Sequence, residues 1–178
     1  MKTTFFASGL VAVIGLFPFQ PVLATDGTIN FTGEISENTC VVTLNNSSNG
    51  TGTVTLPTVS ANALSVATSV AGMTPFTIDL SECQLSGLKM VSTYFEPGPY
   101  VNADGRLIPS DSSGAKNVEI QLLNSEQKAI VAGVLPIEKN DIGSATETSL
   151  SYFAQYYATG AATPGSLSSQ VSYTIVYD

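Results

Sequence analysis

Few side chains in this sequence could do chemistry. The chain has 178 residues, with two cysteines, fourteen acidic residues and no histidine. Without histidine it has no Ser–His or Cys–His pair for nucleophilic catalysis. The carboxylates are scattered, and spacing singles out no pair, although spacing alone does not exclude a glycosidase-type pair formed by folding. We therefore predict no catalytic residue, and a secreted hydrolase becomes the weakest of three functional hypotheses.

The two cysteines, Cys40 and Cys83, favour a structural role. In an oxidising compartment, a lone pair of cysteines is typical of one disulfide. A bridge across a loop of this length stabilises the fold by about 4 kcal/mol in the loop-entropy picture. A redox or metal-binding pair has less support, because the chain has neither a CxxC motif nor a histidine.

Two weaker patterns point to surface loops. Asp104-Gly105 resembles a fragment of a metal-binding loop, but an EF-hand needs several more oxygen ligands, so we interpret it as a turn. Sequons of the form N-x-Ser/Thr matter only where the host glycosylates. They begin at Asn30, Asn45, Asn46 and Asn49. No metal and no cofactor is predicted.

The first residues predict export. Lys2 precedes an apolar run over residues 5–17, and Val22-Leu23-Ala24 supplies a permissive cleavage site. This pattern is typical of a secretory signal peptide spanning residues 1–24. A membrane anchor is the alternative, but Pro18 and Pro21 interrupt a run that is too short to span a bilayer. We therefore expect export without membrane insertion.

The remaining chain is acidic and has the length of one domain. Removing residues 1–24 leaves five basic and fourteen acidic residues, a net charge of −9. A basic surface for nucleic acid is absent, so no nucleic-acid partner is expected. We interpret the scattered acidity as a contribution to solubility.

Strand patterns dominate the rest of the sequence. Short apolar or β-branched runs alternate with turn-rich pieces, which favours an antiparallel sandwich. The "SANALSVATS" stretch allows one helical turn. The predicted strands include "CVVTL", "TVTL", "FTIDL", "LKMVSTYF", "VEIQLL", "AIVAGV" and "LSYFAQYYA".

Both ends of the exported chain carry alternating strands. Near the C-terminus the apolar positions are Val171, Tyr173, Ile175 and Tyr177. The stretch 25–36, "TDGTINFTGEIS", alternates more cleanly and places two glycines on its apolar side. Its apolar positions are Gly27, Ile29, Phe31, Gly33 and Ile35. Both could be ordinary edge strands, but an exposed apolar edge invites aggregation unless something covers it.

Together these pieces resemble the pilins of the chaperone–usher pathway, and most closely the type 1 fimbrial subunits of Gram-negative bacteria. The matching motifs are "GTINFTGEI" followed by Cys40, "FTIDLSEC", "NVEIQLLN" and "YYATGAATPG…VSYTIVYD". Tyr177 in the penultimate position and Gly165, the fourteenth residue from the C-terminus when Asp178 is counted as the first, are the most specific positions. The resemblance extends over essentially all of residues 25–178.

The resemblance implies an all-β fold: an immunoglobulin-like β-sandwich that lacks its last strand. Residues 25–36 would be a donor extension and residues 37–178 the pilin domain. A periplasmic chaperone would first fill the open groove, and at the outer-membrane usher the extension of a neighbouring subunit would replace it. Gly27, Ile29, Phe31, Gly33 and Ile35 would enter five successive pockets. The groove edge would comprise Val171, Tyr173, Ile175, Tyr177 and the Asp178 carboxylate.

The resemblance predicts a non-enzymatic structural subunit of an adhesive surface fimbria, built from copies of one subunit or of several. The alternative is a fimbrial adhesin or tip-adaptor subunit that binds host glycan. Tip adhesins of this family carry an extra receptor-binding domain and lack the donor extension. Because this chain has one domain and keeps residues 25–36, we favour the structural subunit. Major rod subunit and minor subunit both stay open.

Overall fold

The computed structural model describes residues 29–33, 39–47, 49–84 and 87–178. The predicted signal peptide, residues 1–24, lies outside the described residues, as do Gly27 and Ile35. The chain divides into a unit that ends at Ile35 and a second unit, Ser36–Asp178, and each is described by itself. Among the described residues, no helix has the length and apolar character needed to cross a membrane.

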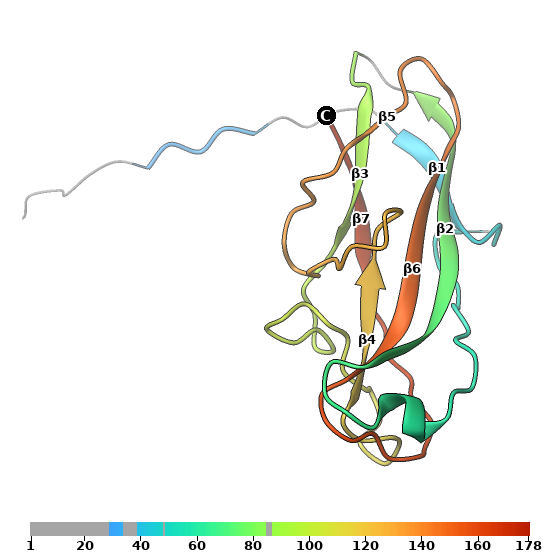
Figure 1. Ribbon diagram of the computed structural model, residues 1–178. Coiled ribbons are helices and arrows are strands. Elements are labelled where there is room, and N and C mark those ends of the chain that lie inside the picture. Colours follow the sequence, from blue (N-terminus) through green and yellow to red (C-terminus); the bar gives the residue numbers. More distant parts are fainter. Residues whose placement is uncertain (1–28, 34–38, 48, 85–86) are drawn as a thin grey trace, which may run out of the picture. The chain divides into compact units, whose positions relative to one another are not determined.

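Four antiparallel strands form the larger sheet of the second unit. They are β1 (Thr39–Leu44), β2 (Val70–Gln84), β6 (Thr148–Ala158) and β4 (Val118–Leu123), in the order β1-β2-β6-β4. β1 therefore lies at one edge of this sheet and β4 at the other (Figure 1).

The smaller sheet packs against the larger one and has the order β5-β3-β7. Its strands are β5 (Asn140–Asp141), β3 (Met90–Phe95) and β7 (Tyr173–Tyr177), all antiparallel to their neighbours. β7 is the last strand of this sheet, so only one of its two backbone edges is paired within the described chain. Like β1 in the larger sheet, β7 is an edge strand.

The core lies between the two sheets and follows from strand periodicity. Along β2, Phe76, Ile78 and Leu80 are buried, while the residues between them are more exposed. Side chains on alternate positions of a strand point to the same face, so this spacing gives β2 one apolar face. The Phe95 ring packs edge-on against the Tyr152 ring, with 5.3 Å between the ring centroids. The predicted all-β sandwich is confirmed.

Most strand predictions agree with the structure, but the prediction for residues 129–134, "AIVAGV", was wrong. The backbone amides of this segment do not form one ladder. The Ile130 amide donates to Leu122, the Ala132 amide to Gly105 and the Gly133 amide to Phe95. Gly133 has a φ of 89°, which turns the chain.

Other boundaries also differ from the predictions. The segment "TVTL" at residues 53–56 is not assigned to a strand, and the short β5 was not predicted. The final strand begins at Tyr173, so Val171, the first of the predicted alternating positions, precedes it. The possible helical turn is a 3₁₀ turn over Ala61–Leu64, whose amide at Asn62 donates to the side chain of Ser60.

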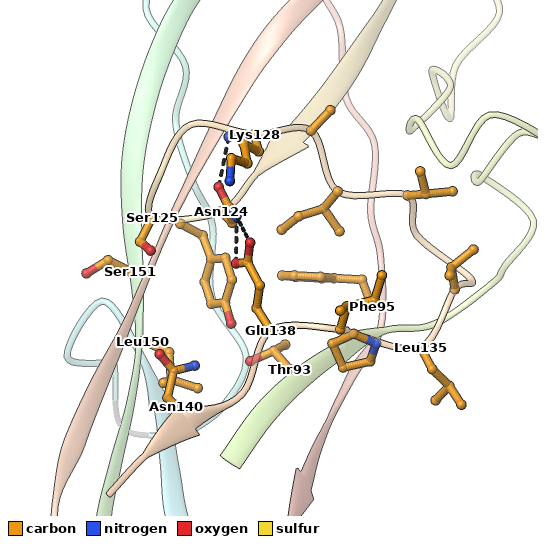
Figure 2. A pocket seen from close by; sticks show the side chains of 17 residues that line it. Thr93, Phe95, Asn124, Ser125, Lys128, Leu135, Glu138, Asn140, Leu150 and Ser151 are labelled. Atoms are coloured by element: carbon orange, nitrogen blue, oxygen red, sulfur yellow. Dashed lines mark hydrogen bonds between the residues drawn. The ribbon is translucent and has the colours of Figure 1, made fainter. Parts of the chain in front are cut away.

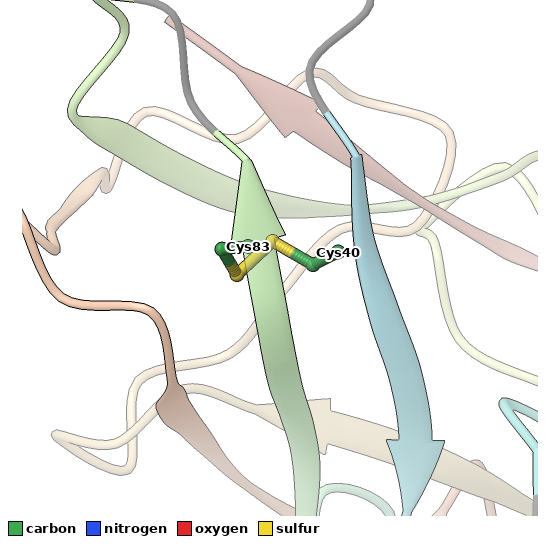
Figure 3. The surroundings of a disulfide bond; sticks show 2 residues. All are labelled: Cys40 and Cys83. Carbon is green, nitrogen blue, oxygen red and sulfur yellow. A yellow bond between two sulfur atoms is a disulfide. The ribbon is translucent and has the colours of Figure 1, made fainter.

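One disulfide joins Cys40 and Cys83, as the sequence predicts. Cys40 lies in β1 and Cys83 near the end of β2, and their Cα atoms are 4.1 Å apart (Figure 3). The bond therefore ties the edge strand β1 to the centre of the larger sheet.

Candidate functional site

An open groove of about 940 Å³ lies between the edge strands of the two sheets. One side is formed by β7 and the residues just before it. The other side is formed by β1 and the segment from Gly50 to Leu56. Core residues form the floor: Phe76, Ile78, Phe95, Leu107, Ile120, Leu122 and Ala154. In a complete sandwich a further strand would cover such a core, so this groove is the position of a missing strand.

The β7 side of the groove carries the residues singled out in the sequence. Val171, Tyr173, Ile175 and Tyr177 are half-buried and all line the groove. Thr174 lies on the opposite face of β7, where its hydroxyl bonds to Glu96. Period-two alternation thus places four apolar side chains on one face, as the sequence indicates. Asp178 does not line the groove. Its side-chain carboxylate lies 3.2 Å from the Lys139 ammonium, and its terminal carboxylate accepts from the backbone amides of Lys89 and Met90.

The opposite side of the groove was not identified from the sequence. Val42 and Leu44 of β1, together with Val54 and Leu56, are half-buried and pack against the core. The β-branched residues of the runs "CVVTL" and "TVTL" indicated that these segments prefer an extended backbone. This preference depends on neighbouring residues in the sequence, so it did not indicate that both segments lie opposite β7 in the fold.

Two tyrosines of β7 reach across the groove. The Tyr173 hydroxyl donates a hydrogen bond of 2.7 Å to the Gly50 carbonyl oxygen. The Tyr177 hydroxyl lies at the backbone of Cys40 in β1. Burial raises the pKa of Tyr173, and it raises the pKa of Tyr177 despite the opposing effect of the Cys40 backbone contact. Both phenols therefore stay protonated at neutral pH and can donate hydrogen bonds.

The first unit supplies the described part of the N-terminal extension. Residues 29–33 adopt no regular secondary structure. Ile29 is 79% exposed and Phe31 is 89% exposed, which is unusual for large apolar side chains. A Cβ atom added at Gly33 would meet no atom within 4 Å. Within the described chain, nothing explains why position 33 carries glycine.

A second, smaller hollow of about 310 Å³ lies between the end of β4, β3 and the loop that leads to β5 (Figure 2). The Asn124 amide donates to both carboxylate oxygens of Glu138, at 2.6 Å each. The Asn124 side-chain oxygen, Oδ1, accepts from the backbone amides of Glu126 and Lys128. The buried Asn124 thus fixes the loops on both sides of this hollow.

The Asp104-Gly105 pair lies in a turn, as predicted; Asp104 is exposed, whereas Gly105 is buried. Gly105 has a φ of 73°, and the Asp104 carboxylate lies 2.6 Å from the Arg106 guanidinium. Arg106 also binds Glu119 at 2.6 Å and lies over the Tyr157 ring. Asp104 and Glu119 thus each form an ion pair with Arg106. Across the described ranges, no three histidine, cysteine, aspartate or glutamate side chains are grouped as a metal ion requires.

The fold and the groove together define a class of protein, the immunoglobulin-like pilins that lack their final strand. The crystal structure of the P pilus rod subunit PapA superposes with a TM-score of 0.60 at 18% identity. The match covers 78% of this chain and 99% of that one. At this identity the likeness establishes the fold.

Sequence comparison establishes the family. The sequence model of the family described as type-1 fimbrial protein A matches residues 56–178. The major fimbrial subunit SMF-1 of Stenotrophomonas maltophilia (strain K279a) is 42% identical, and the alignment covers 87% of this chain and 94% of that protein. The F17 fimbrial protein of Escherichia coli is also 42% identical, with coverages of 94% and 96%. The chain belongs to the type-1 fimbrial protein family, so it is a structural pilus subunit of a cell-surface fimbrium.

Proposed function

We propose that this subunit polymerises by donor-strand exchange. In this proposal residues 25–36 of one subunit fill the groove of a neighbouring subunit. Gly27, Ile29, Phe31, Gly33 and Ile35 point into that groove, while the backbone of the extension pairs with the free edge of β7. The observation that carries the proposal is the apolar groove beside β7.

The physical basis is strand addition. Backbone hydrogen bonds to an unpaired sheet edge supply affinity, and alternate side chains set the register. Ile29 and Phe31 are exposed in the subunit, so burying each in a groove contributes about 2 kcal/mol. Ladder bonds add about 1 kcal/mol each, from which the cost of ordering the extension is subtracted.

The extension is poorly placed to fill the groove of its own subunit. Only Ser36–Thr39 separate Ile35 from the bridged Cys40. Four residues span at most about 14 Å. Each subunit then donates at one end and accepts at the other, so the contact does not close on itself. Contacts of this kind generate filaments.

Before assembly, the same groove needs another occupant. We propose that a periplasmic chaperone lends a strand to the groove and contacts the edge formed by Val171, Tyr173, Ile175, Tyr177 and Asp178. An outer-membrane usher then exchanges this strand for the extension of the next subunit. Export through the periplasm by the signal peptide, residues 1–24, precedes this step.

A peptide-binding assay tests the proposal. A fluorescent peptide with the sequence "TDGTINFTGEIS" is mixed with the disulfide-bonded exported chain at nanomolar concentration, and anisotropy reports binding. The control peptide carries aspartate at the positions of Ile29, Phe31 and Ile35. We expect slow, tight binding of the first peptide only. Equal behaviour of the two peptides would exclude donor-strand exchange.

A further inference from the structure

The segments that form the two sides of the groove differ in their backbone hydrogen bonding. β7 is hydrogen-bonded to β3 along its length. The groove wall formed by Gly50–Leu56 lies outside the strands, and among bonds between described residues no backbone–backbone hydrogen bond involves it. An extended segment whose backbone polar groups lack partners is held only by its side chains and by single contacts. This wall is therefore the least constrained part of the groove, because β1, which lies on the same side, is paired with β2.

Three kinds of contact hold the Gly50–Leu56 wall. The Thr51 backbone amide donates a local hydrogen bond of 2.9 Å to the side-chain oxygen of Asn49. Val54 and Leu56 pack against the core, and Gly52 lies against the side chain of Leu44. The hydrogen bond from Tyr173 to the Gly50 carbonyl oxygen, 2.7 Å long, is the contact that links this wall directly to β7. The approach is close: a Cβ atom added at Gly50 would lie 2.9 Å from the Tyr173 hydroxyl oxygen.

We propose that Tyr173 positions the Gly50–Leu56 wall in the empty subunit, at the distance from β7 that an incoming strand requires. This inference rests on the proposed donor-strand exchange. The ring of Tyr173 is a rigid spacer, and its hydroxyl fixes the start of the wall. A site that is ordered before binding loses less conformational entropy when its ligand arrives, so it binds more tightly. Tyr173 thus acts through the wall and is a positioning residue.

The test compares Tyr173→Phe with the unchanged chain. This variant keeps the aromatic spacer and removes only the donor. Gly50→Ala disturbs the same contact from the other side, because its methyl group meets the tyrosine hydroxyl. Tyr94→Phe is the matched control, since the Tyr94 hydroxyl donates to another glycine carbonyl, that of Gly133, at 3.4 Å and away from the groove.

Two measurements are made on the complete exported chain, residues 25–178. Hydrogen exchange of the Thr51 amide, which donates to the Asn49 side chain, reports the order of the wall in the empty subunit. Anisotropy of the fluorescent "TDGTINFTGEIS" peptide reports the dissociation constant. For Tyr173→Phe and Gly50→Ala we expect faster exchange of the wall and a dissociation constant raised about three- to tenfold, the factor that corresponds to one net hydrogen bond. Tyr94→Phe leaves both measurements unchanged.

The outcomes separate this inference from the proposed function. If the unchanged chain does not bind the peptide, donor-strand exchange fails. If it binds, and Tyr173→Phe binds equally well with unchanged exchange of the wall, the positioning role is overturned. Faster or tighter peptide binding by Tyr173→Phe also overturns the positioning role. The hydrogen bond between Tyr173 and Gly50 would then hinder insertion, because it would have to break before the peptide could enter. Retained circular dichroism and an intact disulfide exclude misfolding as the cause.

Discussion

Cys40 and Cys83 join the first two strands of the larger sheet, and Cys40 lies two residues before Val42, which lines the groove. The bridge therefore restrains β1, which forms part of one side of the groove. Because β1 is an edge strand with a partner on one side only, it depends on this bond more than a central strand does.

Cys40→Ser is expected to lower the free energy of unfolding by about 4 kcal/mol, the loop-entropy contribution of the lost bridge. The measurement is chemical denaturation of the purified subunit, with the yield of periplasmic subunit as a second readout, because proteases remove unfolded chains. The double variant Cys40→Ser/Cys83→Ser is the control for effects of a free thiol. Near-normal stability of the double variant would contradict a structural role for the bridge.

Tyr177→Ala is expected to weaken the complex with the chaperone strongly. Tyr177 is half-buried at the groove edge, and removing its ring leaves a cavity at the place where the strand of the chaperone must pack. Co-purification of chaperone and subunit from the periplasm measures the effect. Thr174→Ala changes the same strand on its outward face and should leave recovery of the complex intact. Equal recovery for both variants would refute the proposed edge.

Gly33→Leu is expected to block this subunit from docking into its neighbour. The space around Gly33 is open in the described chain, so any restriction must come from the groove of the partner subunit. Fibre formation in a reconstituted assembly, followed by electron microscopy, measures docking. Thr32→Leu adds the same side chain on the other face of the extension and should be tolerated. Normal fibres from Gly33→Leu would show that its pocket is assigned wrongly.

Supplying the missing strand within one chain should give a stable monomer. The variant lacks residues 25–36 and carries "TDGTINFTGEIS" after Asp178, joined by the turn Asp-Asn-Gly-Asn. An incoming strand antiparallel to β7 can follow such a turn directly, and linkage removes the concentration dependence of binding. We expect a large rise in melting temperature and a single monomer peak in size-exclusion chromatography.

The control for this variant carries aspartate in place of Ile29, Phe31 and Ile35 in the appended copy. It keeps the backbone of the added strand but cannot fill the apolar groove. If the control melts as high as the parent variant, the domain was complete without a donor, and the donor-strand proposal would have to be abandoned.

Alkaline pH should destabilise the empty subunit through its groove tyrosines. Burial raises the pKa of Tyr173 and Tyr177 above the ordinary value of about 10. Because the folded-state pKa is the higher one, their contribution to stability is complete below pH 10 and is lost as pH rises through the folded-state pKa. The chain has no tryptophan but seven tyrosines, so tyrosinate absorbance reports their summed titration. The difference between the unchanged chain and Tyr173→Phe isolates the contribution of Tyr173.

Binding of the donor peptide should shift this titration to still higher pH, because a filled groove buries both phenols further. In Tyr173→Phe the number of tyrosines whose titration responds to the peptide should fall by one. A titration that the peptide does not change would contradict insertion of the donor strand over these residues.

The sequence alone determined the local features of this protein. Alternation of apolar and polar residues follows directly from the two-residue repeat of a strand, so it revealed Val171, Tyr173, Ile175 and Tyr177 as one face. The lone cysteine pair in an exported chain predicted the bridge between Cys40 and Cys83. Resemblance to known pilins predicted the missing strand.

The tertiary structure decided which distant segments meet. Tyr173 and Gly50 are 123 residues apart, and no periodicity in the sequence connects them. The runs at residues 53–56 and 129–134 have similar strand character, yet one lines the groove without a ladder and the other turns at Gly133. Preference for an extended backbone is local, whereas pairing depends on which backbone edge is available after the sheets pack.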